Sequence, residues 1–140
     1  ILMERKTGGY RKPTPEQRRD SMIGKEDFHC WFSQIWEMPG ASTKNGHPAP
    51  FPLELAERLV RMFSFTKDTV LDPFCGSGTT MLAAAKYGRN SIGVETEAWY
   101  CEHAVRRFET EPNLSDKYQF TYTDLSGEAD SYVTSSGKPA

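Results

Sequence analysis

Apolar positions along the middle of the chain recur with two spacings, one typical of a helix face and one typical of short strands. Residues 53–63 carry apolar side chains at i, i+4, i+7 and i+8, which predicts a helix with one apolar face. The residues that define this spacing are Leu55, Leu59, Met62 and Phe63. Further helices are predicted over residues 79–87 and 97–108, and strands over residues 68–72, 91–95 and 118–122, with a short candidate at 1–3.

Both ends of the chain differ in composition from this middle part. Residues 7–20 contain a Gly-Gly pair, two prolines and many charges, which is typical of a loop and not of the interior of an element. From residue 126 onward Ser, Gly, Asp and Thr replace large apolar residues, which predicts a mobile tail. We therefore expect a connector with a basic loop and an aromatic segment (residues 1–46), a βαβ region (47–125) and a tail (126–140). Within the aromatic segment, Trp31, Phe32 and Trp36 are expected to pack in a core and not to stack on a base.

Composition and charge narrow the classes of protein further. The chain has 140 residues, 37% hydrophobic and 26% charged, which is enough for one domain with a core. A net charge of −2 excludes a uniformly basic nucleic-acid coat but allows a local basic patch. No apolar run reaches the roughly 18 residues of a membrane span. Three cysteines without a C-x-x-C pair argue against a disulfide scaffold and a zinc site, and fit a reducing cytoplasm. No metal is expected.

The strongest chemical signal is a strand, a glycine turn, a helix and a second strand that ends in an acid. Residues 72–80 (DPFCGSGTT) close the first strand–helix turn, and Glu95 ends the second strand about 20 residues later. In such βαβ units the glycines let a ligand approach the backbone N–H groups at the helix start, and the acid accepts hydrogen bonds from ribose hydroxyls. The pattern therefore predicts a ligand that carries a ribose, against the alternative of a tight turn without a ligand.

Three residues discriminate between ribose ligands. Met81 stands where the third glycine of G-x-G-x-x-G would be, and no Lys follows Gly78 as a phosphate-binding loop requires. Asp72 would repel a pyrophosphate, whereas it tolerates a ligand with an ammonium or sulfonium group. S-adenosylmethionine has both groups and no phosphate, so we expect it as the cofactor.

At this point three segments, HPAPFP (47–52), DTVLDPFCGSGTT (68–80) and GRNSIGVE (88–95), resemble the DNA amino-methyltransferases in which the cofactor region follows the catalytic region. These enzymes modify adenine N6 or cytosine N4 in double-stranded DNA. The resemblance implies an α/β, Rossmann-like class I methyltransferase sheet with flanking helices, present here in part. A less specific likeness to the family's connector covers residues 1–46.

The resemblance also implies roles for individual residues. Glu95 would hold the ribose, the 47–50 segment would cover the methionine end, and Asp124 would read the adenine amine. The cofactor set is His47, Pro48, Ala49, Pro50, Asp72, Phe74, Cys75, Gly76, Ser77, Gly78, Thr79, Thr80, Glu95 and Asp124. A basic set is expected to contact DNA phosphates: Arg5, Lys6, Arg11, Lys12, Arg18 and Arg19.

One element of this family has no match in the chain. The family's catalytic loop, an Asp, Ser or Asn followed by Pro-Pro and an aromatic residue, does not occur among the 140 residues. We expect that loop upstream of Ile1, and we expect Ile1 not to be the natural start. The catalytic part would then be a further partner, and the chain alone would be inactive. Two alternatives stay open: a non-catalytic subunit that binds cofactor and DNA and, less favoured, a nucleotide-dependent oxidoreductase.

Overall fold

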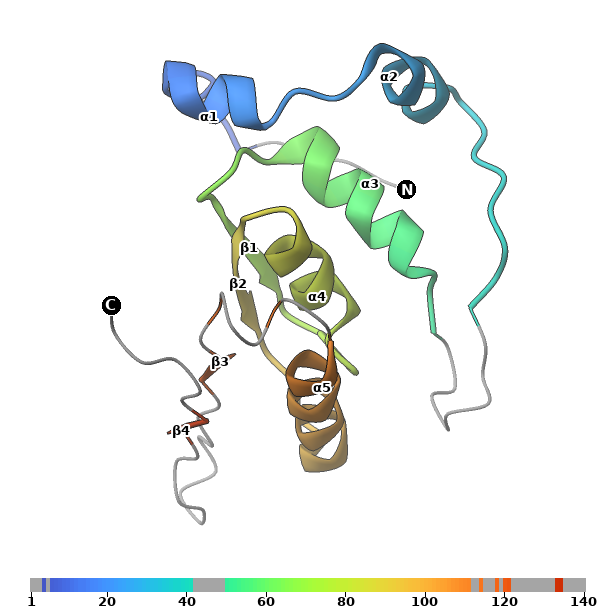
Figure 1. The fold of residues 1–140 in the computed structure, drawn as a ribbon, viewed down its shortest axis with the longest axis vertical. Helices are drawn as coiled ribbons and strands as arrows, with labels where there is room; N and C mark the ends of the chain where they lie inside the picture. Colours follow the sequence, from blue (N-terminus) through green and yellow to red (C-terminus); the bar gives the residue numbers. More distant parts are fainter. Residues whose placement is uncertain are drawn as a thin grey trace.

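Two parallel strands and the helices beside them form the centre of the structure (Figure 1). The computed structural model describes residue 4 and residues 6–41, 50–111, 114, 118, 120–121 and 133–134. The helices are α1 (Pro15–Asp20), α2 (Lys25–Trp31), α3 (Leu53–Phe63), α4 (Thr79–Lys86) and α5 (Ala98–Thr110). The strands are β1 (Thr69–Asp72), β2 (Asn90–Gly93), β3 (Phe120–Thr121) and β4 (Val133–Thr134). The helix predicted over 53–63 is confirmed at both ends, and the other confirmed elements differ from their predicted bounds by at most two residues.

Strands β1 and β2 lie side by side with Thr69 opposite Asn90 and Asp72 opposite Gly93. Helix α4 connects them, which confirms the predicted βαβ unit. Helices α3 and α4 pack together over one face of this sheet, where Val70 contacts a buried cluster of small side chains. The cluster comprises Ala56, Val60 and Ala83. Alanines allow α4 to lie close to both α3 and the sheet, so the start of α4 is held firmly at the carboxyl end of β1.

The opposite face of the same sheet carries apolar side chains that the described residues leave open. Leu71 of β1 is 62% exposed and Ile92, its neighbour across the sheet, is 55% exposed. Val94, one step beyond β2, is also exposed. Parallel sheets are normally covered on both faces. Among the described residues, helices cover this sheet on one face.

The N-terminal arm, which we define as residues 6–41, contains a helix where a loop was expected. The loop prediction for residues 7–20 is wrong over Pro15–Asp20, which form α1. Thr14 and Gln17 make reciprocal side-chain to backbone hydrogen bonds, a capping box, and Pro15 occupies the first helical position. Both features favour a helix start and offset the poor helix propensity of the flanking segment.

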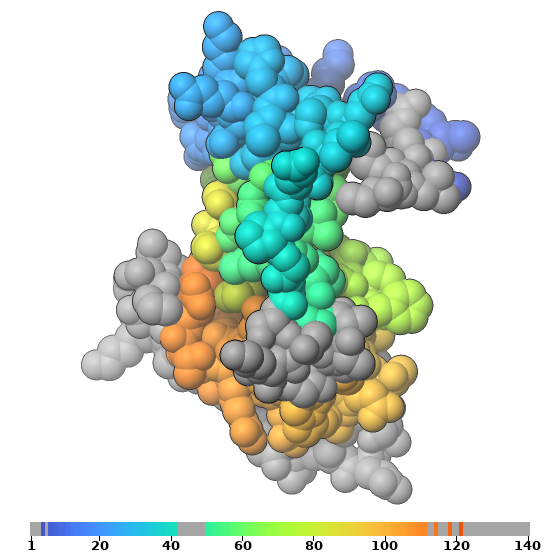
Figure 2. Space-filling view, turned by 90° about the vertical axis from the view of Figure 1, so that its right-hand side faces the viewer, coloured from blue at the N-terminus to red at the C-terminus, as the bar shows by residue number. Residues whose placement is uncertain are grey.

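This arm is attached to the connection between α3 and β1. The Gln17 side chain donates to the carbonyl of Thr66 over 2.8 Å, and the N–H of Thr66 donates to the Ser21 hydroxyl over 2.8 Å. Arg11 forms an ion pair with Asp68. Helices α1 and α2 therefore lie on the side of α3 away from α5, and the segment after α2 runs down along α3, as Figures 1 and 2 both show.

The aromatic segment packs onto α3 through two arginines. Trp31 is buried, and the guanidinium carbon of Arg61 lies 4.5 Å from the centroid of its ring. Trp36 donates from Nε1 to the carbonyl of Trp31, and Arg58 lies 5.4 Å from its ring. The core prediction is confirmed for Trp31 and, half-buried, for Trp36. It is wrong for Phe32, which directly follows α2 and is 52% exposed.

The C-terminal region contributes one short strand pair. In β3 and β4, Phe120 lies opposite Thr134 and Thr121 opposite Val133 in antiparallel order. Strand β4 falls inside the segment predicted as a mobile tail. The rest of that tail, and the strand candidate at 1–3, lie outside the described residues. None of the helices that the structure describes has the length and apolar character needed to cross a membrane.

Candidate cofactor site

The segment between β1 and α4 turns sharply at two glycines with positive φ. Gly76 has φ 49° and Gly78, which caps α4, has φ 76°. Glycine adopts these conformations without the steric cost of a Cβ. The N–H of Gly78 donates to the carbonyl of Cys75 over 2.8 Å, and a Cβ on Gly78 would lie 2.9 Å from that of Ala104 in α5. The glycine turn, which we define as residues 75–79, is therefore fixed at Gly78 by its backbone and by close contact with α5.

Glu95 follows β2, and its carboxylate reaches back to the glycine turn. Oε2 accepts a hydrogen bond from the N–H of Gly76 over 2.9 Å, and Oε1 accepts from the N–H groups of Thr96 (2.8 Å) and Glu97 (3.0 Å). These donors, first of all the N–H of Glu97, lower the pKa of Glu95. The side chain is therefore an anion at neutral pH. Because Oε2 accepts one bond among the described residues, it has capacity for a further donor such as a hydroxyl.

Asp72 stands at the same edge of the sheet as Glu95, because β1 and β2 are parallel and their carboxyl ends meet there. Its Oδ1 accepts a hydrogen bond from the N–H of Phe74 over 3.1 Å. The ring of Phe74 is 87% exposed. Two carboxylates, backbone N–H groups and an open aromatic ring thus gather where β1 and β2 end. This arrangement suits a ligand with hydroxyl groups, a positive charge and an apolar part.

A buried cluster supports the turn from below. Met81 is buried with Cys75 and Ala104, although a glycine stands at this position in the G-x-G-x-x-G pattern. Gly93 in β2 makes the room, because a Cβ there would lie 2.5 Å from Sδ of Met81 and 2.8 Å from Sγ of Cys75. Burial, followed by the charge of Asp72, raises the pKa of Cys75 to about 11. The thiol is therefore protonated at neutral pH and packs as a small apolar group.

Arg107 of α5 also reaches the glycine turn, although the sequence motifs do not single it out. Its Nη1 donates to the carbonyl of Ser77 over 2.8 Å, to the Ser77 hydroxyl over 3.0 Å and to the Thr79 hydroxyl over 3.0 Å. Arg107 lies one helical turn from Ala104, the residue that contacts Gly78. The sequence gives no signal for this contact, because it arises only when α5 packs against the turn.

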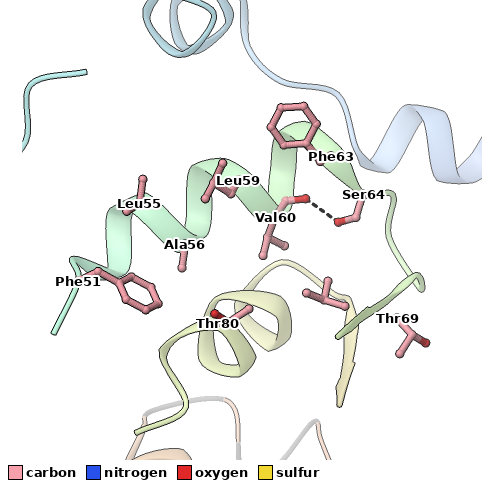
Figure 3. A pocket seen from close by; sticks show the side chains of 10 residues that line it. Phe51, Leu55, Ala56, Leu59, Val60, Phe63, Ser64, Thr69 and Thr80 are labelled. Carbon is pink, nitrogen blue, oxygen red and sulfur yellow. Dashed lines mark hydrogen bonds between the residues drawn. The ribbon is translucent and has the colours of Figure 1, made fainter. Parts of the chain in front are cut away.

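The other residues predicted to bind the cofactor lie in several places. Ser77 and Thr79 belong to the glycine turn, while Pro50 is half-buried ahead of α3. Thr80 points toward α3 and lines an apolar groove (Figure 3). Four predicted residues lie outside the described residues: His47, Pro48, Ala49 and Asp124.

Five of the six predicted DNA-binding residues lie on the N-terminal arm. Lys6, Lys12 and Arg18 belong to its described part, and Arg5 lies outside the described residues. Arg11 is engaged with Asp68 and with the ring of Phe65. Arg19 lies 3.6 Å from its neighbour Asp20. The arm therefore offers some free positive charge, while Arg11 serves to attach it. No cluster of His, Cys, Asp and Glu suited to a metal ion occurs in the part of the chain that the structure describes.

The groove of Figure 3 has a volume of about 490 Å³ and lies between α3, β1 and Thr80 at the start of α4. Apolar side chains of α3 form most of its lining, together with Thr69 and Val70 of β1. The α3 and flanking residues that line it are Phe51, Leu55, Ala56, Leu59, Val60, Phe63 and Ser64. It provides an apolar surface beside a strand whose second edge has no neighbour among the described strands.

The model of the N6/N4 methyltransferase family, described as DNA methylase, matches residues 2–106 of this chain. The type II methyltransferase M.MjaI of Methanocaldococcus jannaschii is 50% identical over 92 residues, which is 61% of this chain and 30% of that protein. M.MthZI of Methanothermobacter thermautotrophicus is 45% identical over 107 residues, which is 69% of this chain and 30% of that protein. The chain spans less than a third of the length of these two relatives.

Solved structures show the same likeness. TTHA0409 from Thermus thermophilus, described as a DNA modification methylase, superposes with a TM-score of 0.70 and 56% identity over 78% of this chain and 45% of its own. The structure of that protein complexed with S-adenosyl-L-methionine gives a TM-score of 0.68 over 42% of its length. The βαβ unit thus has the Rossmann-like class I methyltransferase fold, present in part.

Proposed function

We propose that this chain, which belongs to the family of DNA methylases of the N6/N4 type, is the cofactor-binding part of a site-specific DNA methyltransferase. The methyl group of S-adenosylmethionine would go to the exocyclic amine of adenine (N6) or cytosine (N4) in double-stranded DNA. The observation that carries this proposal is the hydrogen bond from Gly76 to Glu95, which joins the glycine turn to the acid after β2. The S-adenosylmethionine complex of TTHA0409, a 56% identical neighbour, supports the same ligand.

The residues present fit this cofactor. Glu95 is an anion whose Oε2 can accept a ribose hydroxyl, while its Oε1 is occupied by the N–H groups of Thr96 and Glu97. The positive φ of Gly76 and Gly78 turns the chain sharply just before α4, where a ligand would approach the helix N-terminus. Asp72 adds negative charge, which favours an ammonium or sulfonium group and disfavours a pyrophosphate. Phe74 offers an exposed ring to the apolar part.

The bound cofactor would supply an activated methyl group on a sulfonium. The chain's own residues therefore need to bind and orient more than to transfer protons. Asp72 and Glu95 would hold the two ends of the ligand along one edge of the sheet, and Phe74 would exclude water from its open side. The target base must leave the duplex stack to reach such a site.

The remaining part of the enzyme is expected to pack on two open surfaces. One is the apolar groove beside α3 and β1, and the other is the exposed sheet face that carries Leu71 and Ile92. Exposed apolar surfaces of this kind favour a closely packed protein–protein interface. A catalytic part carried by the same protein or by a separate chain is consistent with both surfaces. We place the protein in the cytoplasm, where its free cysteines would stay reduced.

Double-stranded DNA is the proposed substrate, and the N-terminal arm is its proposed contact. Lys6, Lys12 and Arg18 would meet phosphates without reading bases. The attachment of the arm by Arg11 and Gln17 to the α3–β1 connection would hold these charges in a fixed place relative to the cofactor site.

Calorimetric titration of the 140-residue chain tests the cofactor assignment. Glu95→Ala is expected to weaken S-adenosylmethionine binding by about 1–3 kcal/mol, because a charge-assisted hydrogen bond to the ribose is lost. Glu102→Ala is the matched control, since Glu102 is an exposed carboxylate of α5 that pairs with Arg106. Equal affinity of the Glu95 variant and the wild type would contradict the assignment.

Two further measurements separate the alternatives. Binding of NAD in place of S-adenosylmethionine would favour a nucleotide-dependent oxidoreductase. Transfer of a tritiated methyl group to duplex DNA, assayed with and without the catalytic part, separates an enzyme from a non-catalytic subunit. We expect no transfer by the 140-residue chain alone, because nothing in its sequence provides the Pro-Pro-aromatic loop.

A further inference from the structure

The guanidinium of Arg107 is the one cationic side chain among the described residues that hydrogen-bonds to the glycine turn. It spans from α5 to the turn, across 28 to 30 positions of sequence, and contacts Ser77 and Thr79. All three of its acceptors are uncharged oxygens, one of them a backbone carbonyl. Burial lowers its pKa, although a guanidinium stays charged at any ordinary pH.

These bonds add to the packing of the turn against α5. Thr79 is 9% exposed, so its hydroxyl has little access to water, and loss of Arg107 would leave it without this partner. The carbonyl of Ser77 lies between two glycines with positive φ, a segment that has many other conformations available. A charged donor on that carbonyl selects one of them.

We propose that Arg107 is a positioning residue that holds the glycine turn in the conformation that accepts the cofactor. It acts from α5, whereas Glu95, after β2, accepts a hydrogen bond from Gly76 of the same turn. The proposal rests on the proposed function, since the turn must first be the S-adenosylmethionine site. Because Arg107 donates its hydrogen bonds to the turn, its effect would pass through the population of the competent turn.

The neighbouring residue Arg106 provides a matched control. It has the same charge and lies on the same helix, but it is 76% exposed and pairs with Glu102, and it does not contact the turn. Arg107→Met keeps an unbranched apolar stem and removes the donors. Arg107→Lys keeps one charged donor group.

The expected result is a loss of affinity for S-adenosylmethionine of about tenfold or more in Arg107→Met. This follows if the competent turn falls to about a tenth of the population, because apparent affinity scales with that fraction. Arg107→Lys should recover part of the loss, and Arg106→Met should stay within about twofold of the wild type. The melting temperature of each variant is measured first, and calorimetry is run well below it. A loss of affinity then cannot come from unfolded protein.

A double-mutant cycle with Thr79→Val tests the route of the effect. If Arg107 acts through Thr79, the double variant Arg107→Met, Thr79→Val binds S-adenosylmethionine about as weakly as Arg107→Met alone. Hydrogen exchange of the turn amides, without any ligand, should speed up in Arg107→Met and not in Arg106→Met.

The outcomes are distinguishable. A wild-type chain that does not bind S-adenosylmethionine overturns the proposed function and this inference with it. A wild type that binds, together with an Arg107→Met variant of equal affinity, overturns only the inference. If Arg107→Met does not fold, Arg107→Lys and the single Thr79→Val variant still decide: affinity equal to the wild type in both would overturn the role of Arg107.

Discussion

Gly93→Ala is expected to destabilise the fold, although alanine is normally the better residue in a strand. Gly93 ends β2 directly beneath the glycine turn. A Cβ at this position would lie 2.5 Å from Sδ of Met81, 2.8 Å from Sγ of Cys75 and 3.0 Å from Cβ of Cys75. The thioether of Met81 can move, but Cβ of Cys75 is fixed by the backbone of the turn. The strand and the turn must therefore separate.

The magnitude follows from two opposing effects. Alanine reduces the freedom of the unfolded chain, which stabilises by roughly 0.4–1 kcal/mol where no contact is violated. Overpacking of a well-filled core costs about 1–3 kcal/mol. We expect a net loss of about 1–2 kcal/mol in the free energy of unfolding. At roughly 4 °C per kcal/mol for a chain of this size, the melting temperature should fall by about 4–8 °C.

Thermal unfolding followed by circular dichroism measures this loss. Gly40→Ala is the matched control, because a Cβ at Gly40 meets no atom within 4 Å. The pair Gly93→Ala and Met81→Ala should be coupled, since removal of the Met81 side chain relieves the closest contact. The double variant should then be more stable than the sum of the single changes predicts, by about 0.5–3 kcal/mol. A melting temperature of Gly93→Ala at or above that of Gly40→Ala would refute the reasoning, and so would strict additivity.

Two further predictions concern a thiol and the basic arm. The pKa of Cys75 is raised to about 11. Its reaction with iodoacetamide at about pH 8 should therefore be much slower than that of the exposed Cys30, and should become faster as the pH rises above roughly 9. Equal rates for the two thiols, measured by peptide mass spectrometry, would contradict this. Neutralising Lys12 and Arg18 in the complete enzyme should weaken binding to cognate and random duplexes alike, and reduce the slope of log affinity against log salt by up to ~0.9 per lost phosphate contact. A loss confined to the cognate duplex would show that the arm reads sequence, and an unchanged affinity would show that it is only solvated.

The sequence predicts local structure well here because its signals are local. The apolar spacing of α3, the glycines at 76 and 78 and the acid at 95 each act within a few residues or at a fixed offset along a βαβ unit. The capping box at Thr14 and Gln17 was equally local but was outweighed by the loop-like composition around it. Recognising the reciprocal pair Thr14–Gln17 together with Pro15 would have predicted α1.

Tertiary contacts could not be predicted in the same way. Nothing in the spacing of residues indicates that Met81 needs Gly93, or that Arg107 bonds to Ser77, because these pairs are brought together only when α4 and α5 pack on the sheet. The exposure of Phe32 has the same origin. An aromatic residue is apolar wherever it stands, but its burial depends on which face of α2 meets α3.

The glycine turn is thereby fixed by three residues that lie outside it. Glu95, after β2, accepts a hydrogen bond from Gly76, and Arg107 of α5 donates one to Ser77. Met81 packs beneath the turn, in the space that Gly93 leaves. A flexible segment with two glycines would otherwise lose much conformational freedom when it binds a ligand. Since the surrounding elements already order the turn in the folded protein, its conformational entropy is lost on folding and not on ligand binding. Residues outside the turn should therefore affect cofactor affinity as strongly as residues within it.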